Sequence, residues 1–149
     1  MWLLLLAACA GPAAAPSLPG LRASLDTIGV DAAEDGEALR FEHAGPGGRY
    51  AVRVSTTVEP PAVVLRTDGL WSLTRQEGDA AAVVLVLQVA TLNHELHSGR
   101  LALDGATGAV ELTLELPAED GVGAKTLEAG VQRLLRDADA ILPRLAAAR

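Results

Sequence analysis

The residues best suited to chemistry lie at 93–97, where the sequence reads Asn-His-Glu-Leu-His. Zinc metalloprotease helices use H-E-x-x-H, in which two histidines one turn apart bind the metal and the glutamate acts as base. His94 and His97 are three positions apart, a spacing that can still share one helix face. An envelope metal-binding protein or hydrolase would need a further ligand, either His43 or a distant carboxylate. The alternative, which we favour, is that both histidines are solvated at a helix end, where they suit the helix dipole.

Other chemical motifs are incomplete. The run Gly-Pro-Gly-Gly at 45–48 is not followed by Lys-Ser or Lys-Thr, so it predicts a hairpin turn and not a phosphate loop. Residues 104–105 read Asp-Gly but lack the further ligands of a calcium loop. Glu111 and Glu115 are expected on the solvent face of a strand, with no facing acid. We therefore expect no catalytic residue, no metal and no cofactor: a non-enzymatic protein.

The N-terminal segment carries the sole cysteine of the chain. Leu6-Ala7-Ala8-Cys9 resembles a bacterial lipobox, whose cysteine is acylated, and a small-residue tether follows to position 16. No Lys or Arg precedes the short apolar run, which indicates either a start codon further upstream or a chance match. The first interpretation predicts a lipid-anchored protein of the cell envelope. The second predicts a cytoplasmic protein. Either way, residues 1–16 stand apart from one folded domain at 17–149.

Charge and composition exclude some partners. The chain has 12 basic and 19 acidic side chains, a net charge of −7, and only four aromatic residues among its 149. Nucleic-acid binding needs clustered Lys and Arg, or rings for stacking, so it is excluded here. An anionic membrane surface would repel the domain, so membrane contact is expected only through a lipid anchor.

Hydrophobic periodicity predicts the elements that must hold these residues in place. In the first half the pattern gives, in order, a helix at 18–28 ended by Gly29, a polar turn at 31–36, and strands at 39–43, 50–54 and 63–65. The third strand could extend through Asp68-Gly69 to Leu70-Trp71, which would be a core filler or an exposed partner patch. We favour the core.

Residues 80–96 are ambiguous by propensity. Val83–Leu87 would suit a central strand, but the apolar pattern continues past Gln88 to Leu96, too far for an ordinary strand. The segment is therefore predicted to be a helix, with Asp79 as its N-cap and Gly99 as its C-terminal glycine.

The last part of the chain predicts a hairpin and a long helix. Leu101 and Leu103 alternate, 104–108 form a turn, and apolar residues alternate from 110 to 116. An apolar stripe at 127–145 then predicts a helix, with a kink or break near 139–141 caused by Pro143. The order is α-β-β-β-α-β-β-α, which indicates an α+β fold with an antiparallel sheet.

Four short runs resemble the YbjN-like family. They are Ala-Thr-Leu-Asn at 90–93, Gly-Arg-Leu-Ala-Leu-Asp at 99–104, Gly-Ala-Val-Glu at 108–111 and Ala-Asp-Ala-Ile-Leu-Pro at 138–143. The resemblance covers about residues 18–148. It implies a fold similar to type III secretion chaperones, small acidic α+β proteins that usually dimerise and bind partner polypeptides in the cytoplasm. It thus implies a binding or regulatory module whose protein partner the sequence does not identify.

The helix expected at 80–92 is hydrophobic nearly all round. Its apolar length of about thirteen residues falls short of the roughly twenty that a membrane span needs. Two explanations stay open. The helix is buried between the sheet and a neighbouring helix, or its outer face forms a homodimer contact.

Overall fold

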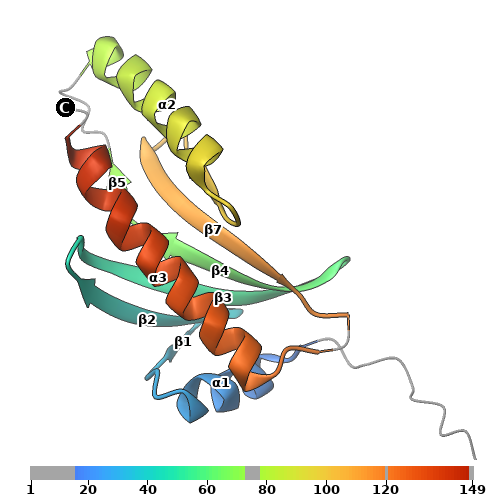
Figure 1. Ribbon diagram of the computed structural model, residues 1–149. Helices are drawn as coiled ribbons and strands as arrows, with labels where there is room; N and C mark the ends of the chain where they lie inside the picture. Colours follow the sequence, from blue (N-terminus) through green and yellow to red (C-terminus); the bar gives the residue numbers. More distant parts are fainter. Residues whose placement is uncertain (1–15, 73–77, 120, 148–149) are drawn as a thin grey trace, which may run out of the picture.

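The structure is a computed structural model that describes residues 16–72, 78–119 and 121–147. Figure 1 shows a twisted sheet with α3 crossing one face, α1 beside the N-terminal half of α3, and α2 at the far end. The helices are α1 (Leu18–Thr27), α2 (Gly78–Glu95) and α3 (Ala124–Ala146). The strands are β1 (Ala33–Asp35), β2 (Ala38–Gly45), β3 (Gly48–Val58), β4 (Pro61–Asp68), β5 (Trp71–Ser72), β6 (Arg100–Leu103) and β7 (Ala109–Pro117).

Every strand pair of the sheet is antiparallel. The strand order is β1-β2-β3-β4-β7-β5, and β6 pairs with the other edge of β7. The predicted α+β class, the antiparallel sheet and the order of the eight main elements are therefore confirmed. Two short strands, β1 and β5, are added to that order.

The two predicted hairpins form where the turn residues stand. Gly45 pairs with Gly48, so the β2–β3 turn is Pro-Gly at 46–47. In the β6–β7 turn, Oδ1 of Asp104 accepts hydrogen bonds from the backbone N–H groups of Ala106 and Thr107. These bonds favour the carboxylate and lower the pKa of Asp104. Asp104 therefore stabilises a turn, as its position in the sequence indicates.

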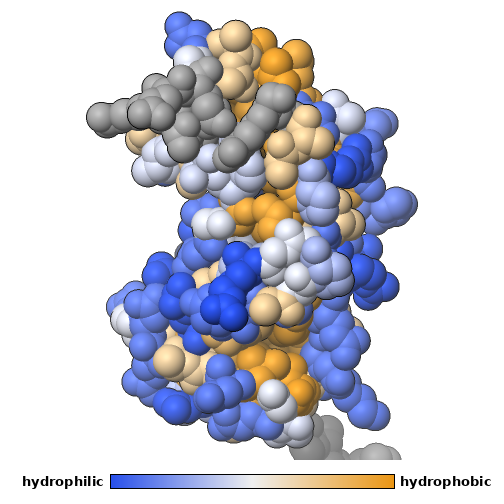
Figure 2. Space-filling view, turned by 90° about the vertical axis from the view of Figure 1, so that its left-hand side faces the viewer, coloured by the Kyte–Doolittle hydropathy of each residue, from blue (hydrophilic) through white to orange (hydrophobic). Residues whose placement is uncertain are grey.

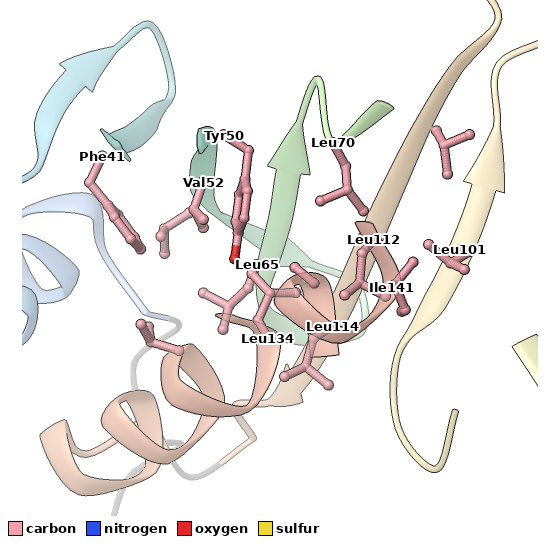
Figure 3. Close-up of a cluster of buried hydrophobic side chains, with 14 of the residues drawn as sticks. Phe41, Tyr50, Val52, Leu65, Leu70, Leu101, Leu112, Leu114, Leu134 and Ile141 are labelled. Carbon is pink, nitrogen blue, oxygen red and sulfur yellow. The ribbon is translucent and has the colours of Figure 1, made fainter. Parts of the chain in front are cut away.

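The core lies between α3 and the sheet. Figure 3 shows Leu134 and Ile141 of α3 facing side chains of the strands, among them Val52 and Leu65. These four side chains are at most 4 % exposed. Because the chain has so few aromatic residues, aliphatic side chains fill most of this space, and each contributes about 1.5–3 kcal/mol on burial. Leu70 is 3 % exposed and Trp71 packs against the core, so the core interpretation of this pair is confirmed.

Two short strands differ from the sequence prediction. Residues 31–36, predicted to be a turn, contain β1, which pairs with the start of β2. Two of its three residues are acidic and none is buried, so no hydrophobic alternation marks it. Leu70-Trp71 do not extend the third strand, because Gly69, at φ 65°, turns the chain after Asp68. Trp71 then pairs with Val110 of β7.

The ends of α2 also differ. The helix begins at Gly78, so Asp79 lies in its first turn and is not the N-cap. It ends at Glu95, four residues before Gly99. Gly99 has a φ of 134°, and it leads the chain into β6 instead of capping the helix.

The expected break in the last helix does not occur. α3 is continuous from Ala124 to Ala146 with Pro143 inside it. Proline removes one hydrogen bond, to the carbonyl four residues earlier, and here that loss falls near the C-terminal end. Ile141 and Leu145 are buried on either side of Pro143, at 4 % and 0 % exposure, so packing holds the helix together.

The predictions for Cys9 and the tether lie almost wholly outside the described residues. Within the described chain, no helix has the length and apolar character of a membrane span.

Candidate functional site

The main candidate site is the face of α2 that points away from the domain, called here the α2 outer face. Figure 2 shows hydrophobic residues at the top of the molecule, at the height of α2. Val83, Val84, Val86 and Leu87 are 59 %, 46 %, 51 % and 63 % exposed. Large aliphatic side chains grouped on one surface in this way indicate an interaction site.

The rest of α2 packs on the domain through one line of residues. Leu85, Val89 and Leu92 are buried, and the helix contacts β6 and α3. The expectation that α2 is buried between the sheet and a neighbouring helix is therefore wrong for its outer face. A helix that is apolar all round has no preferred side, so only the tertiary structure shows which face is covered.

The α2 outer face has the residue spacing of a helix-pairing surface. Ala80, Val83, Leu87, Ala90 and His94 follow one another at intervals of 3, 4, 3 and 4 residues. This is the a/d spacing with which one helix packs against another. No charged residue occurs between Asp79 and His94, so no charge along this stretch opposes burial. The face suits another apolar helix.

The structure places only one of the two histidines of the metal hypothesis on the helix. His94 is in the last turn of α2, whereas His97 lies beyond its end, and both are exposed. The neighbouring Glu95 forms a two-pronged ion pair with Arg144 of α3, at 2.5 and 2.9 Å. The hydrogen bond from Arg144 lowers the pKa of Glu95. Glu95 thus ties α2 to α3.

His43 belongs to a different part of the molecule. It is on β2, and its Nε2 lies 3.3 Å from Oδ2 of Asp139 on α3. Within the described residues, no three His, Cys, Asp or Glu side chains come close enough together to hold a metal ion. The metal or hydrolase alternative built on His94 and His97 therefore gains no third ligand from this part of the chain.

His43, Tyr50 and Asp139 form a polar cluster between the β2–β3 hairpin and α3. His43 and Tyr50 are cross-strand partners with ring centroids 5.2 Å apart. The Tyr50 hydroxyl lies 3.2 Å from both Oδ1 of Asp139 and the carbonyl oxygen of Leu135. Burial, and next the Asp139 charge, raise the pKa of Tyr50. This cluster positions the hairpin on α3, and its members are 96 and 89 residues apart in the chain, so the sequence pattern missed it.

The glycines of the turn allow this close packing. A Cβ atom at Gly45 would lie 2.2 Å from Oδ2 of Asp139, and one at Gly47 would lie 2.7 Å from the Asp139 carbonyl oxygen. The predicted hairpin turn at 45–48 is confirmed. Its glycines do more than turn the chain, because they let α3 approach the hairpin backbone.

Asn93 is a positioning residue that motif analysis did not single out. Its Nδ2 donates to the Leu101 carbonyl at 2.9 Å, and its Oδ1 accepts from the Leu101 N–H at 2.7 Å. The amide thus replaces a neighbouring strand and fixes β6 to the end of α2. Asn93 lies in one of the runs that resemble the YbjN-like family, which is the signal that could have identified it.

The solvent face of the sheet carries a row of paired charges. Arg40, Arg53 and Arg66 stand opposite one another across β2, β3 and β4. Acidic side chains neutralise each of them; the ion pairs are Arg40–Glu42, Arg53–Asp35, Arg53–Asp68 and Arg66–Glu111. Glu111 is therefore on the solvent side, as predicted, and belongs to this row. Glu115 is exposed as well.

The comparisons with known proteins concern the fold. The sequence matches no family model and no curated protein. Among solved structures, YbjN from E. coli is similar with a TM-score of 0.73 and 15 % identity, over 91 % of this chain and 95 % of that one. The ExsC–ExsE complex matches with a TM-score of 0.58 and 20 % identity, over 86 % and 95 % of the two chains. The HopA1–SchA chaperone–effector complex gives 0.55 and 13 %, over 83 % and 90 %.

These likenesses agree with the resemblance that the sequence predicted. At identities of 13–20 % they bear on the fold alone. The arrangement of sheet and helices described above is the one these proteins share with this chain. The protein has a YbjN-like, type III secretion chaperone-like α+β fold.

Proposed function

We propose that this protein is a homodimeric domain that binds a partner polypeptide and carries out no chemistry of its own. The observation that carries the proposal is the α2 outer face, where four large aliphatic side chains are about half exposed or more. Leaving such a surface in water is unfavourable by about 25 cal/mol for each Å². A second copy of the chain would remove it from water.

The α2 outer face suits pairing with itself. Leu87 is the midpoint of the seam that runs from Ala80 to His94. A two-fold axis through Leu87 would place Ala80 of one copy near His94 of the other, and residues 80–93 between them carry no charged side chain. Such self-complementary contacts are the usual basis of symmetric dimers.

The fold neighbours support the partner-binding part of the proposal. One is a chaperone solved in complex with its effector, and another was solved in a two-protein complex. Binding proteins of this kind act through exposed surfaces, and the α2 outer face is such a surface.

Light scattering coupled to size-exclusion chromatography tests the dimer on the full chain under reducing conditions. We expect the wild type to have twice the chain mass and Leu87→Glu to have the mass of one chain. Val58→Glu is the matched control, because Val58 is 72 % exposed on the β3–β4 hairpin and lies outside α2. A wild-type monomer at high concentration, or a dimeric Leu87→Glu variant of unchanged thermal stability, would refute the proposal.

We also propose that Cys9 carries a lipid that anchors the domain to the cell envelope. The lipobox-like run and the small-residue tether support this location. Cells expressing the protein should incorporate a palmitate analogue into the wild type and not into Cys9→Ser. Equal labelling of the two, or none, would favour the cytoplasmic alternative. An in-frame start codon upstream of Met1, followed by Lys or Arg codons, would support the anchor independently.

A further inference from the structure

A second surface lies at the opposite edge of β7 from β4. Two adjoining hollows of about 570 and 580 Å³ meet there, and both are lined by Ser98, Leu114 and Glu115. One extends under α3 to Gly130, and the other extends over β6. We call this surface the β7 groove. It is separate from the α2 outer face.

The backbone of β7 is unpaired along this groove. β6 pairs with β7 only between Val110 and Thr113, although β7 continues to Pro117. The Leu112 N–H bonds to Oγ1 of Thr67 on β4, so the backbone groups of Leu112 point toward β4. Because these directions alternate along a strand, the N–H and C=O of Glu115 point toward the groove. β4 pairs with β7 at Glu115 on the opposite edge, but in the described part of the chain no strand pairs with β7 there on the groove edge.

The outer edge of β6, unlike the groove edge of β7, has its backbone groups hydrogen-bonded by a side chain. Asn93 satisfies the outward backbone groups of Leu101 on β6, as described above. Nothing comparable serves Glu115 among the described residues. The buried Oγ of Ser98 also has no hydrogen-bond partner in the described chain, and it lines the groove where β6 pairing stops. Unpaired donors and acceptors on a sheet edge are the groups to which an added strand bonds.

The walls of the β7 groove carry three arginines. Arg133 and Arg136 of α3 line one hollow, and Arg100 of β6 lines the other. None of them makes an ion pair with a described residue, whereas the arginines on the solvent face of the sheet are paired. Two acids, Glu115 and Asp137, also line the groove. The groove therefore has a net positive charge on a protein whose total is −7.

The floor of the groove is apolar and close to the backbone of α3. Leu114 and Leu116 line it. Leu116 lies so close to Gly130 that a Cβ atom added at Gly130 would be 2.7 Å from Cδ1 of Leu116. If an extended chain lies along Glu115, its side chains alternately contact this floor and point into the hollow over β6. The arginines would be at its sides.

We infer that the β7 groove binds an extended, acidic segment of a partner polypeptide, which adds to the sheet as a strand beside Glu115. The inference rests on the proposed function, since it specifies the kind of partner segment that the domain takes. Backbone pairing with Glu115 supplies the register. Carboxylates of the segment meet Arg100, Arg133 and Arg136, which selects acidic over basic sequences.

Fluorescence anisotropy with a labelled eight-residue peptide of alternating Glu and Val tests this inference on the full chain. We expect binding to be absent for the matched Lys-Val peptide and lost on N-methylation of the Glu-Val backbone, which removes the strand donors. The double variant Arg133→Glu/Arg136→Glu should raise Kd by about tenfold or more, equivalent to about 1.4 kcal/mol. Arg49→Glu is the control, because Arg49 is exposed and makes no ion pair with a described residue, but lies outside the groove. Hydrogen exchange should show slower exchange at the Glu115 amide only with the peptide present.

Several results would overturn the inference. One is equal binding of the acidic and basic peptides, and another is unchanged affinity of the N-methylated peptide, which needs no protein variant. A Glu115 amide protected without peptide would mean that a second copy covers the edge. Displacement of the peptide by millimolar inorganic phosphate would indicate an anion site only. Leu87→Glu separates the two proposals, because its monomer should bind the Glu-Val peptide as the wild type does.

Discussion

Replacing Gly47 by alanine tests how α3 and the β2–β3 hairpin are joined. Gly47 does not have a positive φ, so its backbone conformation accepts alanine. The added Cβ would lie 2.7 Å from the carbonyl oxygen of Asp139 and 2.8 Å from its Cα. Ordinary contacts between carbon atoms are about 3.5–4.0 Å. The hairpin must therefore move away from α3 by about 0.7–1.2 Å.

The movement has a cost that can be worked out from the contacts it disturbs. Overpacking of this kind destabilises a protein by about 1–3 kcal/mol. The hydrogen bond from Tyr50 to Asp139, at 3.2 Å, would be stretched beyond its useful range. Its loss adds about 0.5–1.5 kcal/mol. We expect Gly47→Ala to lower the free energy of unfolding by about 2–4 kcal/mol and Tm by about 6–12 °C.

Urea and thermal denaturation followed by circular dichroism measure this change. Gly105→Ala is the control, because Gly105 also lies in a hairpin turn without positive φ, and its Cβ would meet nothing within 4 Å. Both substitutions restrict the unfolded chain in the same way, so that effect cancels between them. A Gly47→Ala protein as stable as Gly105→Ala would show that α3 does not press on the hairpin as described.

Three further predictions concern single side chains. Tyr50 is the sole tyrosine, and burial raises its pKa above the ordinary value of 10.0, so the unfolded state releases the phenol proton first. The free energy of unfolding should therefore fall as the pH rises above about 10, and Tyr50→Phe should remove this component of the pH dependence. Absorbance at 295 nm, which reports the ionised phenol, should increase only when the protein unfolds. A native protein that ionises Tyr50 near pH 10 would contradict this. Asn93→Ala should lower the free energy of unfolding, measured by urea denaturation, by about 2–3 kcal/mol because it leaves the N–H and C=O of Leu101 unpaired. Equal stability of the variant and the wild type would show that Asn93 does not fix β6 to α2. The Arg144 hydrogen bond lowers the pKa of Glu95, so its stabilisation is present at neutral pH and is lost as the pH falls through the depressed pKa. Glu95→Gln should flatten the acid side of a Tm-against-pH profile slightly, and an unchanged slope would mean that the pair contributes nothing.

Much of the fold could be predicted because its signals are local. The two hairpins follow from turn residues between alternating strands, and the helices at 18–28 and 127–145 follow from apolar stripes. For the long apolar segment at 80–96, length alone favours a helix over a strand. Each of these predictions depends on residues within a few turns or pleats of one another, where backbone geometry sets the period.

The sequence predictions that are wrong concern segments whose pairing or packing partners are far away in the sequence. β1 and β5 have no hydrophobic alternation, and they exist because β2 and β7 offer edges to pair with. The helix at Pro143 continues because the core on both sides outweighs one lost hydrogen bond. Such contributions are absent from a local pattern.

The candidate sites divide in the same way. The local pattern predicts that residues 80–93 of α2 form an apolar stretch of helix without charged side chains, but not which face the domain covers. That face was decided when Leu85, Val89 and Leu92 packed against the rest of the domain and left Val83 and Leu87 in water. The β7 groove, likewise, exists because β6 stops short of Glu115 while arginines of α3 that make no ion pair with a described residue lie beside it. Local spacing fixes which elements form, whereas burial and edge pairing depend on contacts between residues far apart in the chain, and those contacts decide which surfaces stay open.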